Sequence, residues 1–156
     1  MRSIAIIRED SSICDDSGIY KKDCLESLGE DIPVDIMIES CMAYGEVTEQ
    51  NICLRELARS AKTEQPCGLI EGEYHKFLCY GNVAGVKDNF DLCQYYMEIL
   101  GYVGSNYKEA LCILGYTEII PDVEKCQIIE NSENVKVGYV KEVCVKSTFQ
   151  YPQASQ

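Results

Sequence analysis

Ten evenly spaced cysteines constrain this chain of 156 residues more than any other feature of its sequence. Neighbouring cysteines are 10 to 19 residues apart, and no Cys-x-x-Cys pair occurs. Structural zinc sites usually contain close ligand pairs, and the chain has one histidine, so zinc, iron–sulfur and thioredoxin-type redox chemistry are disfavoured. The even count predicts a complete set of disulfides. The expected disulfide cysteines are Cys14, Cys24, Cys41, Cys53, Cys67, Cys79, Cys93, Cys112, Cys126 and Cys144.

Disulfides imply an oxidising compartment, whereas buried free thiols in a reducing cytosol are the competing interpretation. The spacing of about one cysteine per helix and turn favours disulfides. The apolar stretch Ile4 to Ile7 is far too short for the core of a signal peptide. We therefore expect a secreted protein, present here as a mature chain without its signal peptide. The connectivity stays open, because ten cysteines allow roughly 945 complete pairings.

Two stretches of the sequence resemble each other and suggest an internal repeat. They are CMAYGEVTEQNIC, from Cys41 to Cys53, and CILGYTEIIPDVEKC, from Cys112 to Cys126. Each has a tyrosine three or four residues after its first cysteine, and a further cysteine lies at similar distances on either side. We expect two degenerate copies of one helical unit in a single compact molecule. The expected segments are an N-terminal arm (1–16), a first repeat (17–81), a second repeat (88–147) and a flexible tail (148–156).

Apolar residues recur with helical periodicity along most of the chain, which predicts an all-α, disulfide-stapled helical bundle. Proline and glycine punctuation places the ends of the helices. The expected helices are 17–28, 33–44, 48–61, 73–80, 89–100, 105–114 and 121–130. The helix over 48–61 is expected to bury Ile52, and residues 82–87 are expected to form a loop that joins the two copies. Residues 135–146 fit either a strand or a helix, and the repeat favours a helix.

The charge of the chain excludes two classes of partner. Its 26 acidic and 14 basic side chains give a net charge of −12, without any run rich in lysine and arginine. Nucleic acids and anionic membranes attract cationic surfaces, so neither is an expected partner. No apolar run is long enough to cross a membrane, so membrane insertion is not expected either. The acidity serves solubility or complements a basic partner.

No catalytic, cofactor-binding or metal-binding residues stand out, so the chain is expected to be neither an enzyme nor a cofactor carrier. His75 with Cys79 at i+4 would form a nucleophilic pair only if that cysteine were unpaired. Adjacent carboxylates such as Asp15 and Asp16 lack the remaining ligands of a calcium loop.

Tyrosine is the residue type most in excess, with eleven copies. The motif tyrosines Tyr44 and Tyr116 occupy matched positions in the two similar stretches, and we expect both rings to be packed. An aromatic interaction surface is the alternative role for tyrosine. Its candidates gather near one expected turn and are Tyr95, Tyr96, Tyr102 and Tyr107.

The paired Cys-Tyr-Cys blocks resemble those of the bicycle proteins, secreted salivary effectors of gall-forming aphids. The matching residues are Cys41, Tyr44, Cys53, Cys112, Tyr116 and Cys126. The resemblance implies a protein that is secreted from the salivary gland, delivered into plant tissue and active by binding an unidentified host protein, without established catalytic residues. The alternative is an extracellular helical carrier of a small apolar ligand. The chain lacks the cysteine spacing of saposin-like and odorant-binding proteins. The carrier hypothesis therefore depends on the apolar helices and on the presence of an internal cavity.

Overall fold

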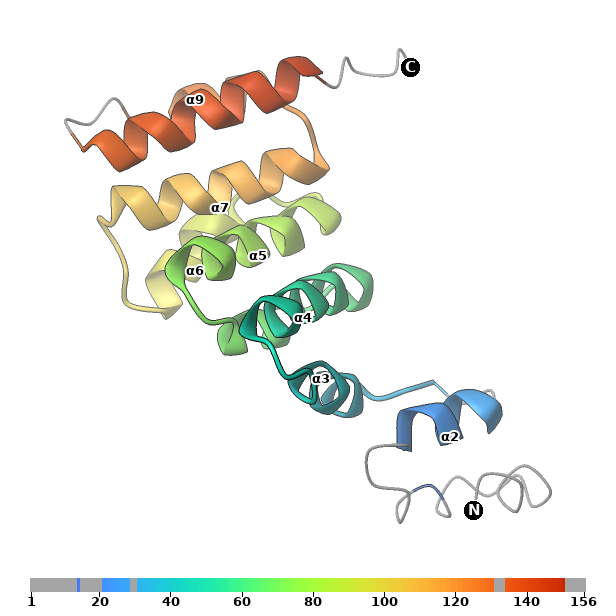
Figure 1. The fold of residues 1–156 in the computed structure, drawn as a ribbon. Coiled ribbons are helices and arrows are strands. Elements are labelled where there is room, and N and C mark those ends of the chain that lie inside the picture. Colours follow the sequence, from blue (N-terminus) through green and yellow to red (C-terminus); the bar gives the residue numbers. More distant parts are fainter. Residues whose placement is uncertain (1–13, 15–20, 29–30, 131–133, 151–156) are drawn as a thin grey trace, which may run out of the picture. The chain divides into compact units, whose positions relative to one another are not determined.

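The computed structural model describes residues 14, 21–28, 31–130 and 134–150. These residues form helices and turns, with no strand among them, which confirms the predicted all-α class (Figure 1). They fall into two compact units, 1–57 and 58–156. The helices are α2 (Lys21–Leu28), α3 (Val34–Met42), α4 (Val47–Ala61), η2 (Gln65–Leu69), α5 (Glu73–Val86), α6 (Leu92–Ile99), α7 (Asn106–Ile119), α8 (Val123–Ile128) and α9 (Val135–Gln150).

The first unit has a small core between α2 and α3. Cys14, Cys24 and Leu25 are buried there, and the half-buried side chains of Ile32 and Ile36 pack against them. A core of this size contributes little burial free energy, because hydrophobic stabilisation scales with the apolar area removed from water. The disulfide between Cys14 and Cys24 therefore supplies a substantial share of the local stability.

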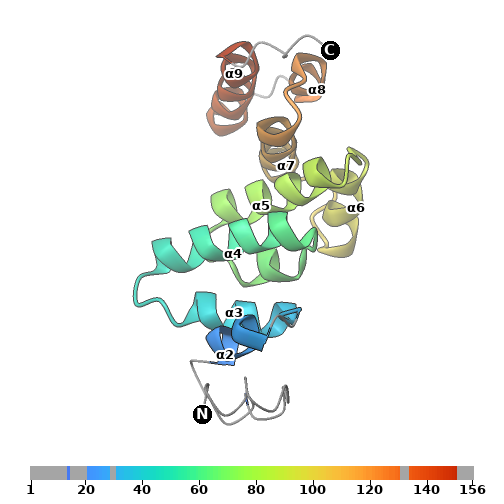
Figure 2. The ribbon, with the colours of Figure 1, turned by 90° about the vertical axis from the view of Figure 1, so that its right-hand side faces the viewer.

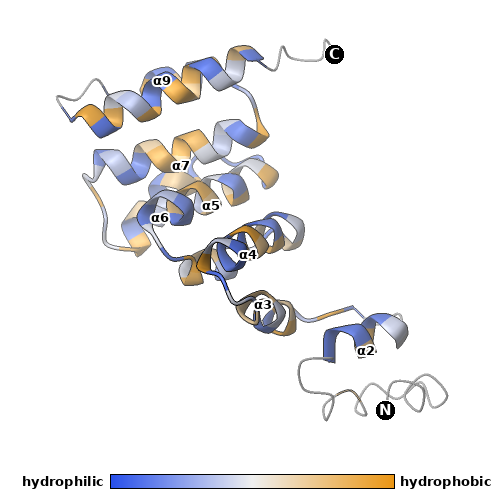
Figure 3. Cartoon of the chain, in the orientation of Figure 1, coloured by the Kyte–Doolittle hydropathy of each residue, from blue (hydrophilic) through white to orange (hydrophobic). Residues whose placement is uncertain are grey.

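The second unit is built on three long helices, with α7 between α5 and α9 (Figures 1 and 2). Apolar and polar residues both occur along these helices (Figure 3). The middle helix α7 buries an unbroken run of eight residues from Ala110 to Thr117. A helix that is apolar on most of its circumference needs partners on several sides, and α5 and α9 are two of these partners.

Glycines set the close crossing of α5 and α7. A Cβ atom added at Gly81 would collide with the backbone oxygen of Cys112, and one at Gly115 would collide with the backbone oxygen of Leu78. Asn82 Nδ2 donates a hydrogen bond of 2.7 Å to the Gly115 oxygen across the same contact. The prediction of a loop over residues 82–87 is wrong, because these contacts hold α5 helical as far as Val86.

The ambiguous segment near the C-terminus is helical. Val137, Val140 and Cys144 lie at i, i+3 and i+7 of α9, and all three are buried. This spacing puts them on one helix face. The segment is a helix because this conformation buries all three side chains against α7 and α8. Residues 148–150 of the expected tail also belong to α9, whereas 151–156 lie outside the described residues. The expected N-terminal arm, 1–16, lies outside them too, except for Cys14.

All ten cysteines form disulfides, as predicted, and each bridge joins two consecutive cysteines of the sequence. The bridges are Cys14–Cys24, Cys41–Cys53, Cys67–Cys79, Cys93–Cys112 and Cys126–Cys144.

The first Cys-Tyr-Cys block is therefore closed by its own bridge, whereas both cysteines of the second block bond outside it. The compact units 1–57 and 58–156 also differ in extent from the expected repeats 17–81 and 88–147. The twofold repeat stays a prediction.

A threefold pattern runs through the second unit. Its three bridges each join a short element to the long helix that follows, and the pairs are η2 with α5, α6 with α7, and α8 with α9. In each long helix the bridged cysteine follows a leucine or valine and stands five residues after a tyrosine. The tyrosines of this pattern are Tyr74, Tyr107 and Tyr139. The helices α5, α7 and α9 are thus built on one local sequence plan.

Candidate interaction surface

His75 and Cys79 do not form a reactive pair. His75 is exposed, and its ring makes an edge contact with Tyr74 at 5.3 Å between centroids. Cys79 is bonded to Cys67 and therefore offers no free thiol to act as a nucleophile. Among the described residues, no group of three or more His, Cys, Asp or Glu side chains is placed to hold a metal ion. No helix in this part of the chain has the length and apolar character needed to span a bilayer.

The two motif tyrosines have different environments. Tyr116 is 5% exposed and packs edge-on against Phe90 at 5.1 Å between ring centroids, as predicted. Burial, together with the nearby charges of Asp88 and Asp122, raises the pKa of its phenol. Tyr44 is 50% exposed, so the prediction of a packed ring is wrong for this residue. The reason is its position, because α3 ends at Met42 and Tyr44 lies in the turn that follows.

Exposed apolar side chains gather at the end of α6 and in the turn that leads to α7. We call this group the α6–α7 surface, and its members are Tyr95, Ile99, Leu100, Tyr102 and Val103. They are between 36% and 74% exposed. Such a run of large apolar side chains within nine residues is unusual for a solvated turn and is typical of an interaction site.

The local sequence explains why these side chains face solvent. Tyr95 and Ile99 are four residues apart on α6 and therefore lie one above the other on the same helix face. Gly101 ends the helix with a positive φ of 74°, and Tyr102 N–H donates to the Met97 oxygen at 2.8 Å. This is the hydrogen bond of a glycine-terminated helix, and it turns the chain so that the next residues project outward.

Lys108 fixes the far end of the α6–α7 surface. Its Nζ lies 3.4 Å from the ring centroid of Tyr102 and 3.0 Å from Glu73 Oε1. The Tyr102 ring also meets Phe77 edge-on at 5.5 Å between centroids. The side chain of Lys108 is only 14% exposed, so the cation–π contact and the ion pair are partly shielded from water. Tyr102 is thus held in one orientation before any partner arrives.

The aromatic layer continues inward from this surface. Tyr96 is 1% exposed, so the suggestion that it belongs to an interface is wrong, whereas Tyr95 and Tyr102 are exposed as that suggestion requires. The Tyr96 ring lies 4.8 Å from that of Tyr80, centroid to centroid. Burial and the nearby charge of Glu64 raise the pKa of Tyr96 well above its usual value. Its hydroxyl is buried and has no hydrogen-bond partner among the residues that the structure describes.

The fourth candidate tyrosine, Tyr107, lies in the first turn of α7. Tyr107 is partly buried, and the Lys136 Nζ lies 5.7 Å from its ring centroid. The sequence did not point to exposure of Ile99, Leu100 and Val103, because helical periodicity does not distinguish an exposed apolar residue from a buried one at a helix end. The signal that could have found them is the run of apolar residues closely interrupted by Gly101 and Gly104.

A pocket between α7 and α8 bears on the carrier alternative. It has a volume of about 140 Å³ and is lined by acidic Glu109 and Glu130 as well as by Ile113 and Ile129. Pockets for drug-sized ligands usually measure about 300–1,000 Å³ and are mostly apolar. The size and the acidic lining of this pocket give no support to a carrier of apolar ligands.

Because comparison with known proteins finds no match, a function can be assigned only from the residues and their geometry. No protein-family model matches the chain, and neither the curated proteins nor the solved structures give a significant match.

Proposed function

We propose that this protein is a secreted, non-catalytic effector that acts by binding a host protein through the α6–α7 surface. The observation that carries the proposal is the cluster of five exposed apolar side chains at the end of α6 and in the following turn, which a backbone hydrogen bond holds in place. Tyrosine and aliphatic residues of this kind form the centres of protein interfaces, where they contribute most of the binding free energy. The expected target is a protein with an apolar depression that accepts Tyr95 and Val103.

Five disulfides fit a secreted or extracellular protein, because such bridges persist in oxidising environments. They also suit a protein that must stay folded after delivery into foreign tissue. Each bridge lowers the entropy of the unfolded chain and contributes typically about 2–4 kcal/mol. Delivery into plant tissue rests on the resemblance of the Cys-Tyr-Cys blocks to those of aphid salivary effectors.

Pre-organisation supports binding at this site. Side chains that are ordered only on binding cost about 0.5–1.5 kcal/mol each. Tyr102 is already held by Lys108 and Phe77, so little of this cost applies to it. The surface also presents few charges of its own, and apolar contact rather than steering by charge is expected to dominate the affinity.

The test is enrichment of host proteins from plant tissue extract on the immobilised, disulfide-bonded protein, followed by measurement of Kd with each purified candidate. The variant carries Tyr95→Ser, Ile99→Ser and Val103→Ser. The matched control removes similarly exposed apolar side chains from α9, through Val135→Ser and Tyr139→Ser.

We expect the α6–α7 variant to bind its target at least about tenfold more weakly than wild type, because central interface residues contribute about 1–3 kcal/mol each. The α9 control should bind as wild type does. Equal loss in both variants would show that the surface is not specific. If the target binds wild type and the α6–α7 variant equally well, the binding site lies on another face and the proposal is wrong.

A further inference from the structure

A second exposed apolar group lies in the first unit, at the turn between α3 and α4. We call it the α3–α4 corner, and its apolar members are Met42, Tyr44 and Val47, which are 43%, 50% and 43% exposed. Ile52 of α4, expected from the sequence to be buried, is 61% exposed. The expectation was wrong because α4 buries Asn51, Leu54 and Ala58, which lie on the opposite side of the helix.

Acidic side chains accompany these apolar residues. Glu39 precedes Met42 by three residues on α3, and Glu49 precedes Ile52 by three residues on α4, so each carboxylate lies beside an apolar side chain. Glu46 lies in the turn itself, two residues after Tyr44. All three carboxylates are exposed, and none forms an ion pair within the described part of the chain.

The charge of the first unit reinforces this pattern. Residues 1–57 contain thirteen acidic and five basic side chains, a net charge of −8 out of −12 for the whole chain. The α3–α4 corner therefore lies in the more strongly negative part of the sequence. Negative potential of this kind attracts cations and repels acidic proteins, including second copies of this chain.

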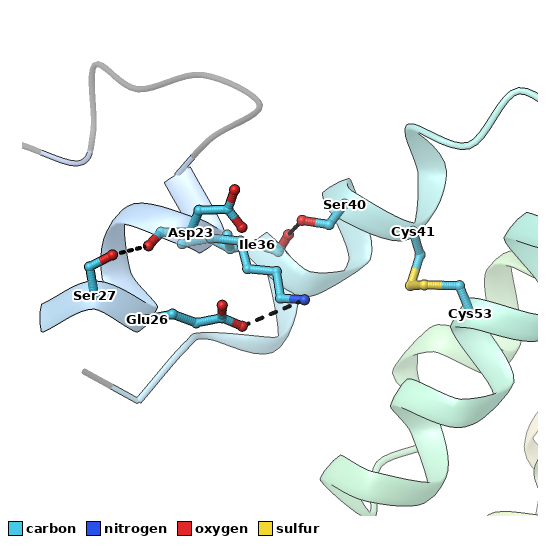
Figure 4. A network of polar contacts seen from close by, with 8 residues as sticks. Asp23, Glu26, Ser27, Ile36, Ser40, Cys41 and Cys53 are labelled. Atoms are coloured by element: carbon cyan, nitrogen blue, oxygen red, sulfur yellow. Dashed lines mark hydrogen bonds and ion pairs between the residues drawn. A yellow bond between two sulfur atoms is a disulfide. The ribbon is translucent and has the colours of Figure 1, made fainter. Parts of the chain in front are cut away.

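The geometry of the corner is fixed from both sides. Cys41 near the end of α3 is bonded to Cys53 in α4 (Figure 4). Gln50 Nε2 donates hydrogen bonds of 3.3 Å to the Met42 oxygen and 2.7 Å to the Tyr44 oxygen. The Gln50 side chain thus pairs with the last carbonyl of α3, which the helix end would leave without a partner, and with one carbonyl of the turn. The bridge and these hydrogen bonds hold the exposed side chains in a defined arrangement.

We propose that the α3–α4 corner binds a cationic amphipathic segment of a partner protein. Apolar side chains of the segment pack on Met42 and Tyr44, and its lysines or arginines face Glu39, Glu46 and Glu49. An amphipathic basic helix presents both features at helical spacing. Complementary charge selects this occupant over an acidic or uncharged one. The inference is independent of the α6–α7 surface, which lies in the other unit.

The probe is a fluorescein-labelled peptide, Leu-Lys-Lys-Leu-Leu-Lys-Leu repeated twice, and its binding is followed by fluorescence anisotropy. A peptide with Glu in place of every Lys reports on apolar contact without charge complementarity. We expect saturable binding of the Lys peptide and no detectable binding of the Glu peptide. Raising the salt concentration should weaken the Lys peptide, because screening acts on exposed charges.

Two variants test the two halves of the corner. Glu39→Gln, Glu46→Gln and Glu49→Gln together remove the charges, and Met42→Ser with Tyr44→Ser removes the apolar contacts. The matched control makes the same number of charge changes in the second unit, through Glu98→Gln, Glu124→Gln and Glu130→Gln. Circular dichroism of each variant shows whether it is folded.

We expect each corner variant to weaken the Lys peptide at least about tenfold, and the control to change Kd less than about twofold. Equal weakening by the control would overturn the proposal and leave only attraction between a basic peptide and an acidic protein. Wild-type affinity in the two corner variants would also overturn it. Sedimentation of the free protein gives a separate outcome, since self-association abolished by the corner variants would make a second copy the occupant.

The serine variant of the α6–α7 surface separates this inference from the proposed function. It should bind the Lys peptide as wild type does, while losing the host target. If instead it loses the peptide, the peptide binds at the α6–α7 surface and the corner is not its site.

Discussion

Replacing Gly81 with alanine tests the close crossing of α5 and α7. A Cβ at this position would overlap the Cys112 oxygen and would lie 2.7 Å from the Tyr116 nitrogen and 2.8 Å from the Gly115 Cα. All three are backbone atoms of α7, so no side-chain rotation can relieve the overlap. Ordinary van der Waals contact begins near 3.4 Å, so the helices would have to separate by roughly 1 Å or more.

The expected change in the free energy of unfolding of Gly81→Ala combines two opposing effects. Alanine is a better helix former than glycine by about 0.8–1 kcal/mol, which favours the variant. Overpacking of a well-packed contact costs about 1–3 kcal/mol, and a rigid backbone contact belongs at the upper end of that range. We expect Gly81→Ala to lower the free energy of unfolding by about 2 kcal/mol net.

Gly138→Ala is the matched control. Gly138 lies in α9 and is exposed, and among the described residues no atom beyond its chain neighbours and its own helix backbone would lie within 4 Å of an added Cβ. Only helix propensity acts there, so the control should be more stable than wild type by up to about 1 kcal/mol.

The assay is urea unfolding followed by circular dichroism, with the disulfides intact. The midpoint for Gly81→Ala should fall below that of wild type and the midpoint for Gly138→Ala should rise above it. If Gly81→Ala is as stable as Gly138→Ala, the two helices do not cross as described.

Three further predictions concern other parts of the fold. Tyr96→Phe should leave stability unchanged or raise it by about 1–3 kcal/mol at neutral pH, because it removes a buried hydroxyl that has no partner in the described part of the chain. Burial and Glu64 raise the pKa of Tyr96 above its unfolded value of 10.0, so its neutral form favours the folded state; that contribution is complete below pH 10 and is lost as the pH rises through the folded pKa. Unfolding midpoints at pH 9 and about pH 11 should therefore differ less in Tyr96→Phe than in wild type, and an equal difference would contradict the assignment. Asp122→Ala should destabilise the protein by about 0.5–2 kcal/mol in thermal unfolding, because the Asp122 carboxylate accepts a 2.9 Å hydrogen bond from the Glu124 N–H at the start of α8, whereas Asp122→Asn should change it less. Peptide mapping without reduction should find only bridges between consecutive cysteines, and reduction should add about ten hydrogens to the intact mass; any bridge that skips a cysteine would refute the connectivity.

The sequence predicted the helical class and the use of all ten cysteines because both follow from local patterns. Apolar spacing at i, i+3 and i+7 identified the buried face of α9 even though Val135 to Val145 also alternates like a strand. The even count of cysteines and the absence of close pairs predicted disulfides without the structure. Such inferences require only the order of residues along the chain and the geometry of a helix.

Features that depend on contact with a partner helix could not be predicted from the sequence. Gly81 and Gly85 are weak helix formers, so residues 82–87 were expected to be a loop; only the surface of α7 explains why glycine is required there. Tyr44 and Tyr116 occupy similar sequence positions, but one follows the last turn of α3 and the other lies inside α7. Ile52 is exposed because α4 buries a different face. The apolar periodicity of this helix did not determine which face that would be.

The order of the disulfides bears on how this chain becomes oxidised. When a protein enters an oxidising compartment from its N-terminus, the second cysteine of each bridge appears while its native partner is the most recent unpaired cysteine, because every bridge joins two consecutive cysteines of the sequence. Vectorial entry thus selects one pairing among roughly 945 without any need to break and reshuffle bridges. Oxidation during secretion should therefore give the native protein more efficiently than oxidation of the complete reduced chain, where all ten thiols compete at once.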